Sequence, residues 1–342
     1  MQNHPTSASS MIAGLYTMSL RLVVGWTYFS AFWRRMILTN KLDPDTTGYI
    51  GEKFNHFLPN ALGIKPIIEY LVSNPESLWW AMLLFTIIEA ATGLLLMLGF
   101  MTRLMSISVI FLALGILFGA GWLGTTCLDE WQIGVLGFAA GLAIFFSGGG
   151  SYSLDQYLKR YAWGRHRTIQ WLASGELPWY PGTLKKTAFA GALFALFITL
   201  FTNQYFHGGV WGVLHNKSVS PKLEMERIRL NKTDLSFDVF RTEGADVYGS
   251  FLIGITLHSA EGDTIIDLNS ESLASLPARN IKNHYVARIK PGKHSLVIPL
   301  GAKATITLTD DRLSGLAPGS YSLTLTDISG ITWEKEFIYQ AH

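Results

Sequence analysis

Residues 78–100 read LWWAMLLFTIIEAATGLLLMLGF, an apolar run in which Glu89 is the one charged residue. A helix needs about 20 apolar residues to cross the hydrocarbon core of a membrane. Further apolar runs of comparable length lie at 11–33, 104–123, 131–147 and 187–206. The sequence therefore predicts an α-helical membrane bundle, with a four-helix core within residues 1–160 and a fifth transmembrane helix at 187–206.

The composition also favours a membrane protein. Of the 342 residues, 49% are apolar and 15% are charged, whereas soluble domains carry about a quarter charged residues. A disordered chain is excluded and a wholly soluble one is disfavoured. The net charge of +2 is too small for a protein that neutralises phosphates, so no nucleic-acid partner is expected. The single cysteine excludes an intrachain disulfide, and no metal site is expected.

Charge divides the chain into two parts. Residues 1–221 hold 24 charged side chains, whereas the shorter segment 222–342 holds 28. In the second segment apolar and polar residues alternate, and Gly, Pro, Asn and Asp turn signals interrupt the pattern about every ten residues. This pattern predicts an all-β sandwich of the immunoglobulin type over 207–342. A basic linker at 161–186 separates the four-helix region from the fifth helix.

The loop charges predict how the helices are oriented. Segment 148–186 carries six Lys and Arg residues against two acidic residues, which places it in the cytoplasm by the positive-inside rule. By alternation, loop 34–77, loop 124–130 and the sandwich then lie on the extracytoplasmic side. The five basic residues of loop 34–77 argue the other way, although five acidic residues accompany them.

Two ionisable residues are expected at mid-membrane depth, Arg21 in the first helix and Glu89 in the second. A charge inside a membrane is costly and usually has a partner or lies on a functional path. The two side chains can pair with each other. Whether they form a structural ion pair or deliver protons to a buried redox cofactor stays open at this stage.

The loop Gly121–Gln132 gathers the one thiol, Cys127, with Asp129, Glu130 and two tryptophans. A reactive thiol needs an electropositive, partly exposed setting. Loop 34–77 offers one on the same predicted face, because it contains four residues that can hold a small dianion and lower the pKa of the thiol: Arg34, Arg35, Lys53 and His56. The alternatives are a buried, inert cysteine and arginines that merely extend toward water from a helix end.

Three other motifs are interpreted structurally. Gly148–Gly150 predict the end of a helix, because no Lys-Ser/Thr follows as in a phosphate-binding loop. His207 is interpreted as part of a surface turn that leads into the sandwich, since no second ligand stands at metal-binding spacing. Segment 161–184, with three tryptophans among basic residues, predicts a short amphipathic helix at the membrane interface.

Several of these stretches resemble one family. Residues 21–35, Gly51–Gly63, Thr102–Arg103 and Gly121–Gly134 closely resemble the DoxD subunit of thiosulfate:quinone oxidoreductase, within the wider DoxX-like membrane family, over about 15–160. From about 184 onward, through His207-Gly208-Gly209 and the strand-rich tail, the chain is similar to the partner subunit DoxA. The chain thus looks like a DoxD–DoxA fusion in a bacterial or archaeal cytoplasmic membrane.

The resemblance implies that two thiosulfate ions are coupled to tetrathionate while a membrane quinone takes two electrons. The hypothesis that follows assigns Cys127 as the thiolate that engages thiosulfate, with Asp129 and Glu130 as further catalytic groups. The expected thiosulfate-binding residues are Arg34, Arg35, Lys53, His56 and Thr126. The expected quinone-binding residues are Trp33, Trp122, Trp131, Arg21 and Glu89. The quinone type is not specified, and association of the chain with itself stays open.

Two other classes of function fit parts of the sequence. A DoxX-like bundle without chemistry of its own could act as a membrane scaffold, with the sandwich as a docking module for another redox protein. A transporter for sulfur anions would share the basic outer loop, but five helices without evident inverted repeats make it the weaker alternative.

Overall fold

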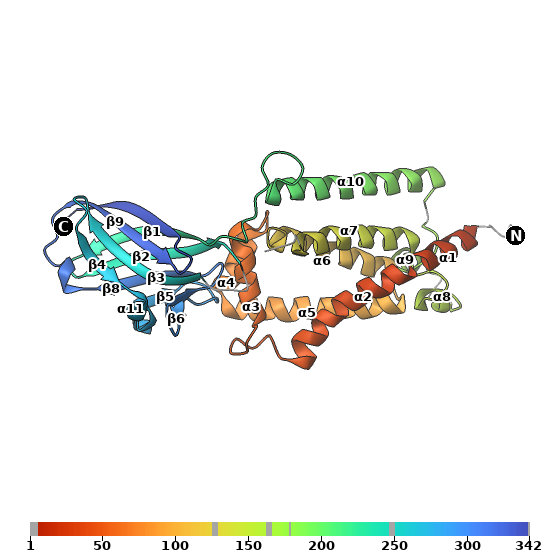
Figure 1. Cartoon of the computed structure of the whole chain (residues 1–342). Coiled ribbons are helices and arrows are strands. Elements are labelled where there is room, and N and C mark those ends of the chain that lie inside the picture. The colour runs from red at the N-terminus through yellow and green to blue at the C-terminus, as the bar shows by residue number, and fades with distance from the viewer. Residues whose placement is uncertain (1–5, 125–128, 162–165, 178, 246–249, 341–342) are drawn as a thin grey trace. The chain divides into compact units, whose positions relative to one another are not determined.

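The computed structural model describes residues 6–124, 129–161, 166–177, 179–245 and 250–340. It confirms an N-terminal helical region followed by a C-terminal all-β domain (Figure 1). By packing, the chain forms two units: one comprises residues 1–49, 79–122 and 128–215, and the other 50–78, 123–127 and 216–342. We call them the helical unit and the sandwich unit.

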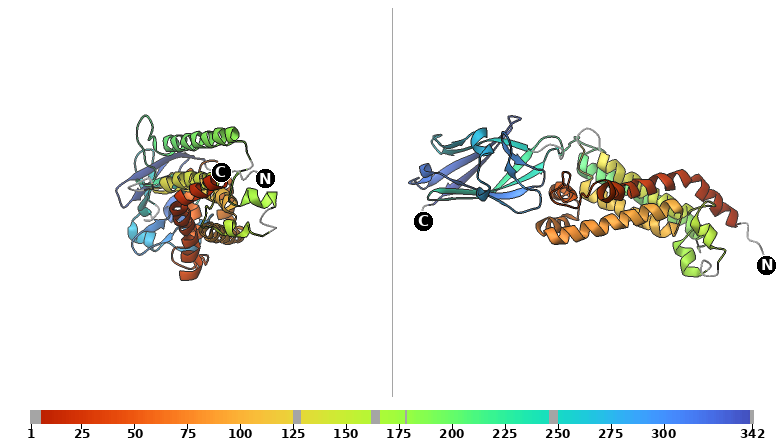
Figure 2. Two further views of the ribbon diagram at one scale, coloured as in Figure 1. Left: turned by 90° about the vertical axis from the view of Figure 1, so that its right-hand side faces the viewer. Right: turned by 90° about the horizontal axis from the view of Figure 1, so that it is seen from below.

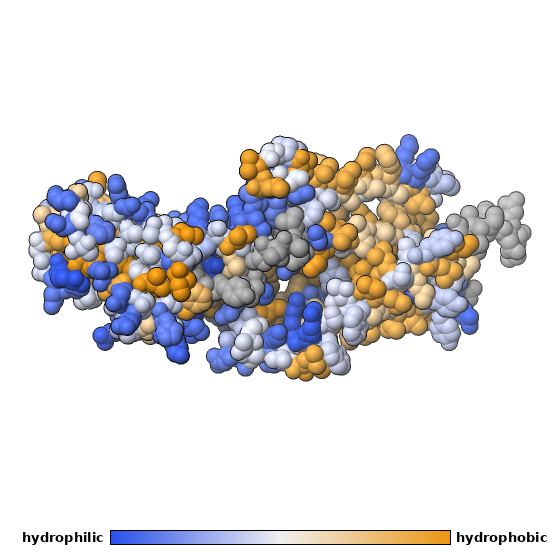
Figure 3. All heavy atoms as spheres, viewed as in Figure 1, coloured by the Kyte–Doolittle hydropathy of each residue, from blue (hydrophilic) through white to orange (hydrophobic). Residues whose placement is uncertain are grey.

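The helical unit contains long apolar helices joined by short segments. Its elements are α1 (Thr6–Tyr16), α2 (Met18–Phe32), the π-helical turn η1 (Trp33–Leu38), most of α5 (Pro75–Leu98), α6 (Thr102–Ala120), α7 (Asp129–Ser147), α8 (Leu154–Leu158), α9 (Arg167–Leu172) and α10 (Pro181–His207). Within the described residues, four helices are long and apolar enough to cross a membrane: α5, α6, α7 from Glu130, and α10. Figure 3 shows hydrophobic side chains gathered over these helices on the face in view.

The first of the five predicted spans, 11–33, is not a single helix. The backbone leaves helical geometry at Thr17, whose hydroxyl lies 2.7 Å from that of Ser147 on α7. The run continues beyond the predicted end through the π-helical turn to Leu38. The prediction of uninterrupted apolar spans is therefore confirmed for four helices, and the first segment is divided into α1, α2 and η1.

Four helices share one core, as the sequence predicts for the DoxD-like part. Tyr28 on α2, Leu96 on α5, Val109 and Leu112 on α6 and Ile144 on α7 are buried against one another. Where α2 crosses α5 (Figures 1 and 2), Gly25 and Gly93 allow the two backbones to approach closely. A Cβ on either glycine would collide with the facing helix, as expected for small residues at membrane helix crossings.

The sandwich unit contains two antiparallel sheets. Its strands are β1 (Lys222–Asn231), β2 (Asp234–Glu243), β3 (Ser250–Ser259), β4 (Thr264–Leu268), β5 (Ile281–Asn283), β6 (Lys290–Pro291), β7 (Leu296–Ile298), β8 (Lys303–Thr309), β9 (Gly319–Asp327) and β10 (Thr332–Tyr339). One sheet has the order β1-β2-β8-β5, and the other β10-β9-β3-β7-β6 with β4 beside β3. Short helices α11 (Ser270–Ala274), η4 (Ala278–Asn280) and η5 (Asp311–Leu313) connect strands.

Alternation along the strands builds the sandwich core. Leu235, Phe237 and Val239 on β2 are fully buried, and so are Leu323 and Leu325 on the other sheet. Residues between them face outward, which is the period-2 pattern expected of a sheet with one buried face. The predicted two-sheet β domain is confirmed.

Three short helices from the predicted outer loop 34–77 also belong to the sandwich unit. They are α3 (Ile50–Phe57), η2 (Leu58–Asn60) and α4 (Lys65–Ser73). Leu58, Ile68 and Val72 form a cluster with Phe240 and Tyr285 of the β domain. Helices that precede all four candidate membrane spans in the chain thus fold with the C-terminal domain.

Candidate functional site

A buried ion pair lies inside the helical unit. Glu89 on α5 is 2% exposed, and its carboxylate accepts a hydrogen bond from the guanidinium of Arg35 on η1. The Arg35 guanidinium carbon also lies 5.9 Å from the ring centroid of Phe85, one turn before Glu89 on the same helix. The side chain of Arg35 is 23% exposed. The helical unit therefore contains a neutralised charge pair with an apolar ring beside it.

The π-helical turn places the two neighbouring arginines differently. A π-helical turn is wider than an α-helical one and is common at functional sites. Arg35 pairs with Glu89, whereas Arg34 is exposed and donates a hydrogen bond of 3.3 Å to the carbonyl of Ser30. Trp33 at the start of the turn is 42% exposed and packs against Phe29. The charge of Arg35 is thus already matched, and Arg34 is the exposed member of the two.

Arg21 does not pair with Glu89, which corrects the predicted mid-membrane pair. Its guanidinium donates to the carbonyls of Gly149 and Tyr152, at 2.7 Å for Tyr152. The reason is the helical run, which continues to Leu38 and so brings Arg35, not Arg21, to the level of Glu89. Arg21 lies at the loop that follows α7. Gly148, with φ +70°, ends that helix as predicted.

A second polar cluster surrounds Asp155, which the sequence analysis did not single out. The carboxylate is 4% exposed and accepts hydrogen bonds from the amide groups of Met101 and Thr102 and from the hydroxyls of Thr102 and Ser174, at 2.6 to 3.0 Å. Arg103 donates to the carbonyls of Phe145, Ala173 and Gly175. These contacts tie the α5–α6 turn, α8 and residues 173–175 together.

Residues 173–175, within the predicted interfacial segment 161–184, belong to the Asp155 cluster. Within the described residues that segment forms the six-residue helix α9, and Ala173 and Ser174 after it are buried. Lys159 lies nearby, where burial and the charge of Arg103 lower its pKa despite the opposing effect of Asp155. No sequence signal separated Asp155 from the other charges of this basic segment.

The predicted catalytic loop is described in part. Cys127 and Thr126 lie outside the described residues, and Asp129 is the first residue of α7. Glu130 follows in the first turn of that helix and is half-buried. Trp122 is 1% exposed, and the indole N–H of Trp131 donates a hydrogen bond of 3.0 Å to the hydroxyl of Thr202 on α10. The tryptophans at 122 and 131 therefore pack within the protein.

His207 does not lie in a surface turn, contrary to the prediction. Helix α10 continues to this residue, and the left-handed Gly208 (φ +63°) ends it. The imidazole is 1% exposed, and its Nε2 lies 2.9 Å from the carbonyl oxygen of Gly121. Since a carbonyl only accepts, Nε2 carries the proton. His207 thus holds the end of α6 at the loop that leads to Cys127, a role that its His-Gly-Gly sequence alone did not reveal.

The remaining predicted anion-binding residues lie on α3 in the sandwich unit. Lys53 is exposed, whereas His56 is 8% exposed and packed within that unit. Between them, Asn55 is fully buried: its amide donates to the carbonyl of Gly301 at 2.8 Å and accepts from the backbone N–H of Ala287 at 3.1 Å. The predicted convergence of Lys53 and His56 with Arg34, Arg35 and Cys127 on one pocket stays a prediction.

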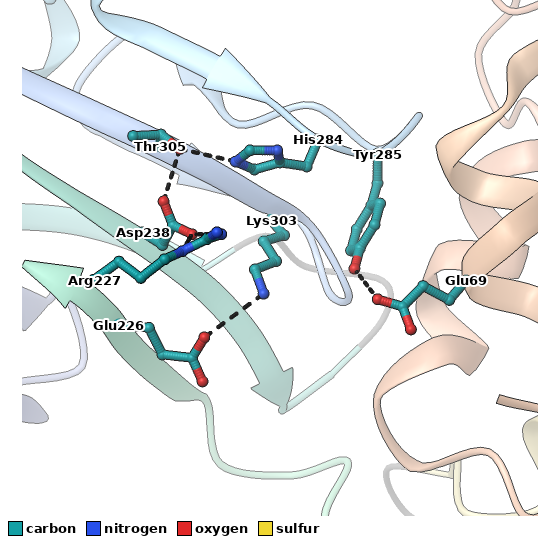
Figure 4. A network of polar contacts seen from close by, with 8 residues as sticks. All are labelled: Glu69, Glu226, Arg227, Asp238, His284, Tyr285, Lys303 and Thr305. Atoms are coloured by element: carbon teal, nitrogen blue, oxygen red, sulfur yellow. Dashed lines mark hydrogen bonds and ion pairs between the residues drawn. The ribbon is translucent and has the colours of Figure 1, made fainter. Parts of the chain in front are cut away.

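A polar network covers the outer face of the β1-β2-β8-β5 sheet beside α4 (Figure 4). Asp238 accepts hydrogen bonds from Arg227 and from the hydroxyl of Thr305, which in turn lies 2.8 Å from Nε2 of His284. Burial alone raises the pKa of Asp238, but these hydrogen bonds and the charge of Arg227 outweigh it, and the pKa lies below its ordinary value. The network is a stabilising feature of the sheet face.

Both parts of the chain match models of known protein families. A family model described as "TQO small subunit DoxD" matches residues 16–180, and one described as "TQO small subunit DoxA" matches residues 206–336. The chain combines DoxD and DoxA in one polypeptide. Three of the four candidate spans lie in the DoxD segment, and α10 connects it to the DoxA segment.

Helices α3 and α4 match one family, and the strands that they contact match the other. Asn55 belongs to the DoxD segment and Gly301 to the DoxA segment, so their hydrogen bond joins the two. TQO denotes thiosulfate:quinone oxidoreductase, a quinone-linked enzyme, and the two families support an oxidoreductase of this kind in a multi-pass membrane protein. Thiosulfate and a quinone are the partners that the families suggest.

Proposed function

We propose that the DoxD–DoxA chain oxidises two thiosulfate ions to one tetrathionate ion and transfers the two electrons to a membrane quinone. The observation that carries this proposal is the match of one polypeptide to both TQO small-subunit families. The candidate membrane spans support it, because a quinone with an isoprenoid tail dissolves in the bilayer. The DoxA segment faces the extracytoplasmic side in this proposal, which follows the loop charges.

The proposed sulfur chemistry uses Cys127 as a nucleophile. The thiolate and the sulfane sulfur of a first thiosulfate form an S–S bond while the quinone takes two electrons and two protons and becomes quinol. A second thiosulfate then attacks the sulfane sulfur of this adduct, so that tetrathionate leaves and the thiolate returns. Asp129 and Glu130 are proposed to handle protons, and Thr126 to contact the substrate.

Two of the predicted cationic side chains are exposed and can therefore contact the anionic substrate. Thiosulfate carries two negative charges, and two such ions repel each other unless cations screen them. Of the predicted residues, Arg34 and Lys53 are exposed, whereas Arg35 is paired with Glu89 and His56 is buried. We therefore keep Arg34 and Lys53 as the proposed thiosulfate contacts and assign Arg35 differently below.

The test uses the whole chain purified in detergent, with thiosulfate and a short-chain ubiquinone. Quinol and tetrathionate should appear in equal amounts. Cys127→Ser is expected to lower the rate at least ~100-fold, because a hydroxyl is a far weaker nucleophile than a thiolate. Intact-mass analysis should show one thiosulfate-derived adduct on the parent chain and none on Cys127→Ser.

Two other results would change the proposed function or its mechanism. If Cys127→Ser retained the parent rate, the covalent step would be wrong while the oxidoreductase function stood. A properly folded chain that neither binds a quinone nor oxidises thiosulfate would instead be a membrane scaffold, with the sandwich as its docking module.

A further inference from the structure

We infer that Arg35 and Glu89, with the ring of Phe85 beside them, form the site that binds the quinone head group and exchanges its proton. This inference rests on the proposed function for the identity of the ligand and deepens it by naming the residues. It moves Arg35 from the thiosulfate site to the quinone site and removes Arg21 from the latter.

The net charge of the pair favours a neutral ligand. A guanidinium and a buried carboxylate in contact cancel each other, so the pair itself presents no net charge to a neutral quinone. A dianion such as thiosulfate would be repelled by Glu89, which is 2% exposed and is screened little by water. The pair is therefore poorly suited to hold thiosulfate and well suited to a quinone.

The geometry leaves donors for a quinone oxygen. A guanidinium carries five N–H donors. Among the described residues, the side chain of Arg35 donates one hydrogen bond, to the carboxylate of Glu89. Nearly a quarter of the side-chain surface of Arg35 is exposed, so a ligand can reach this side chain from outside the core. A quinone carbonyl is an acceptor, and the ring of Phe85 supplies an apolar neighbour for the quinone ring.

Glu89 supplies the proton chemistry. Conversion of a quinone to a quinol adds two electrons and two protons, and a carboxyl group held at the quinone oxygen can give one of those protons. The Glu89 carboxylate of the ion pair first takes a proton from the aqueous side, gives it to the quinone oxygen as the electrons arrive and returns to its pair with Arg35; the same cycle delivers the second proton. Ionisable groups inside membrane bundles commonly mark such proton paths.

The backbone conformation at Arg35 also differs from that of the preceding helix. Arg35 reaches Glu89 from a π-helical turn, not from a regular α-helix. Such turns persist where a side chain must be redirected for function.

The first part of the experiment measures quinone binding without thiosulfate, so its result does not depend on the proposed oxidation. The second part measures turnover with thiosulfate. The parent chain in detergent is titrated with decylubiquinone, and tryptophan fluorescence reports binding. The variants are Glu89→Gln, Arg35→Gln and the double variant, which removes both charges and leaves no unpaired buried charge to destabilise the fold. Glu76→Gln, an exposed acid in the first turn of α5, is the matched control.

We expect Arg35→Gln and the double variant to weaken quinone binding ~10- to 100-fold, the range for loss of a hydrogen bond to a charged group. Glu89→Gln should lower kcat for quinone reduction more than it changes the KM for thiosulfate. Glu76→Gln should match the parent. Parent-like quinone binding and turnover in a folded double variant would show that the pair is only structural. Displacement of the quinone by thiosulfate would show that it is an anion clamp, and either result overturns the inference.

Failure of the proposed function is a separate outcome. If the parent binds the quinone in a manner that depends on Arg35 but thiosulfate does not reduce it, the site stands and the electron donor has been wrongly assigned.

Discussion

Asn55 and Gly301 lie 246 residues apart in the chain, yet the Asn55 amide donates a hydrogen bond of 2.8 Å to the Gly301 carbonyl. The same side chain accepts from the backbone N–H of Ala287. Because Asn55 is fully buried, water cannot replace its hydrogen bonds to these two backbone groups. The DoxD helices α3 and α4 and the DoxA sheets thus fold as one unit.

Asn55→Ala should destabilise the sandwich unit. The substitution removes both hydrogen bonds and leaves a buried N–H and a buried C=O unsatisfied, at a cost of about 1–3 kcal/mol for each group. Thermal unfolding of the purified chain should show the loss. Asn74→Ala, at an exposed asparagine that ends α4, is the control and should stay within about 0.5 kcal/mol of the parent. Equal midpoints for the two variants would contradict the proposed role of Asn55.

Gly301→Ala tests the same contact from the other side. Gly301 has φ +73°, and a Cβ built on it would lie on the carbonyl group of Asn55. Alanine therefore adds a backbone collision to the cost of a left-handed residue, which is about 1–2 kcal/mol. Gly315 (φ +90°) has open space around its Cβ position, so Gly315→Ala carries only the second cost. The melting temperature should fall clearly further for Gly301→Ala, and similar decreases would show that α3 packs less tightly than described.

These contacts also show which features of the fold could be predicted from the sequence and which could not. Long apolar runs predicted α5, α6, α7 and α10, and alternation predicted the sheets, because both patterns are local. The pairing of Asn55 with Gly301 has no local pattern, since it depends on the fold of the DoxA segment. Arg21 was placed at the depth of Glu89 by counting along an apolar run, and the continuation of the helix to Leu38 invalidated that count.

The role expected for the sandwich must also be tested differently. Deletion of residues 215–342 is the simplest way to ask whether the proposed thiosulfate oxidation needs this domain. In the structure that deletion would expose Leu58, Ile68 and Val72, which pack against Phe240 and Tyr285. Loss of activity would then report misfolding of the 50–78 segment.

The Asp238 network predicts a dependence of stability on pH. The pKa of Asp238 lies below its ordinary value of 3.8, since hydrogen bonds from Thr305 and Arg227 outweigh the opposite effect of burial. A depressed pKa in the folded state means that the stabilising contribution is present above the ordinary pKa and is lost as pH falls through the folded-state value. Asp238→Asn should therefore lower the melting temperature at pH 7, and its difference from the parent should shrink as the pH falls below the ordinary pKa of 3.8.

The matched control for this prediction is Asp310→Asn. Asp310 also has a lowered pKa, caused first by its hydrogen bond to Arg312, but its side chain is 23% exposed, against 5% for Asp238. Exposed pairs contribute about 0–1 kcal/mol, so the pH 7 effect should be smaller than at Asp238. A pH-independent difference between Asp238→Asn and the parent would rule out the ionic explanation and point to packing alone.

His207 allows a substitution that separates its hydrogen bond from its charge. A glutamine at this position can place its amide N–H where Nε2 lies and keep the bond to the Gly121 carbonyl, whereas leucine has similar bulk and no donor. His207→Leu should therefore leave that carbonyl unsatisfied beside the fully packed Trp122, cost about 1–3 kcal/mol and increase proteolysis in the 121–131 loop. His207→Gln should resemble the parent in both measurements. If glutamine failed as leucine does while the chain stayed folded, the imidazole itself, and not its bond to Gly121, would be what the loop requires.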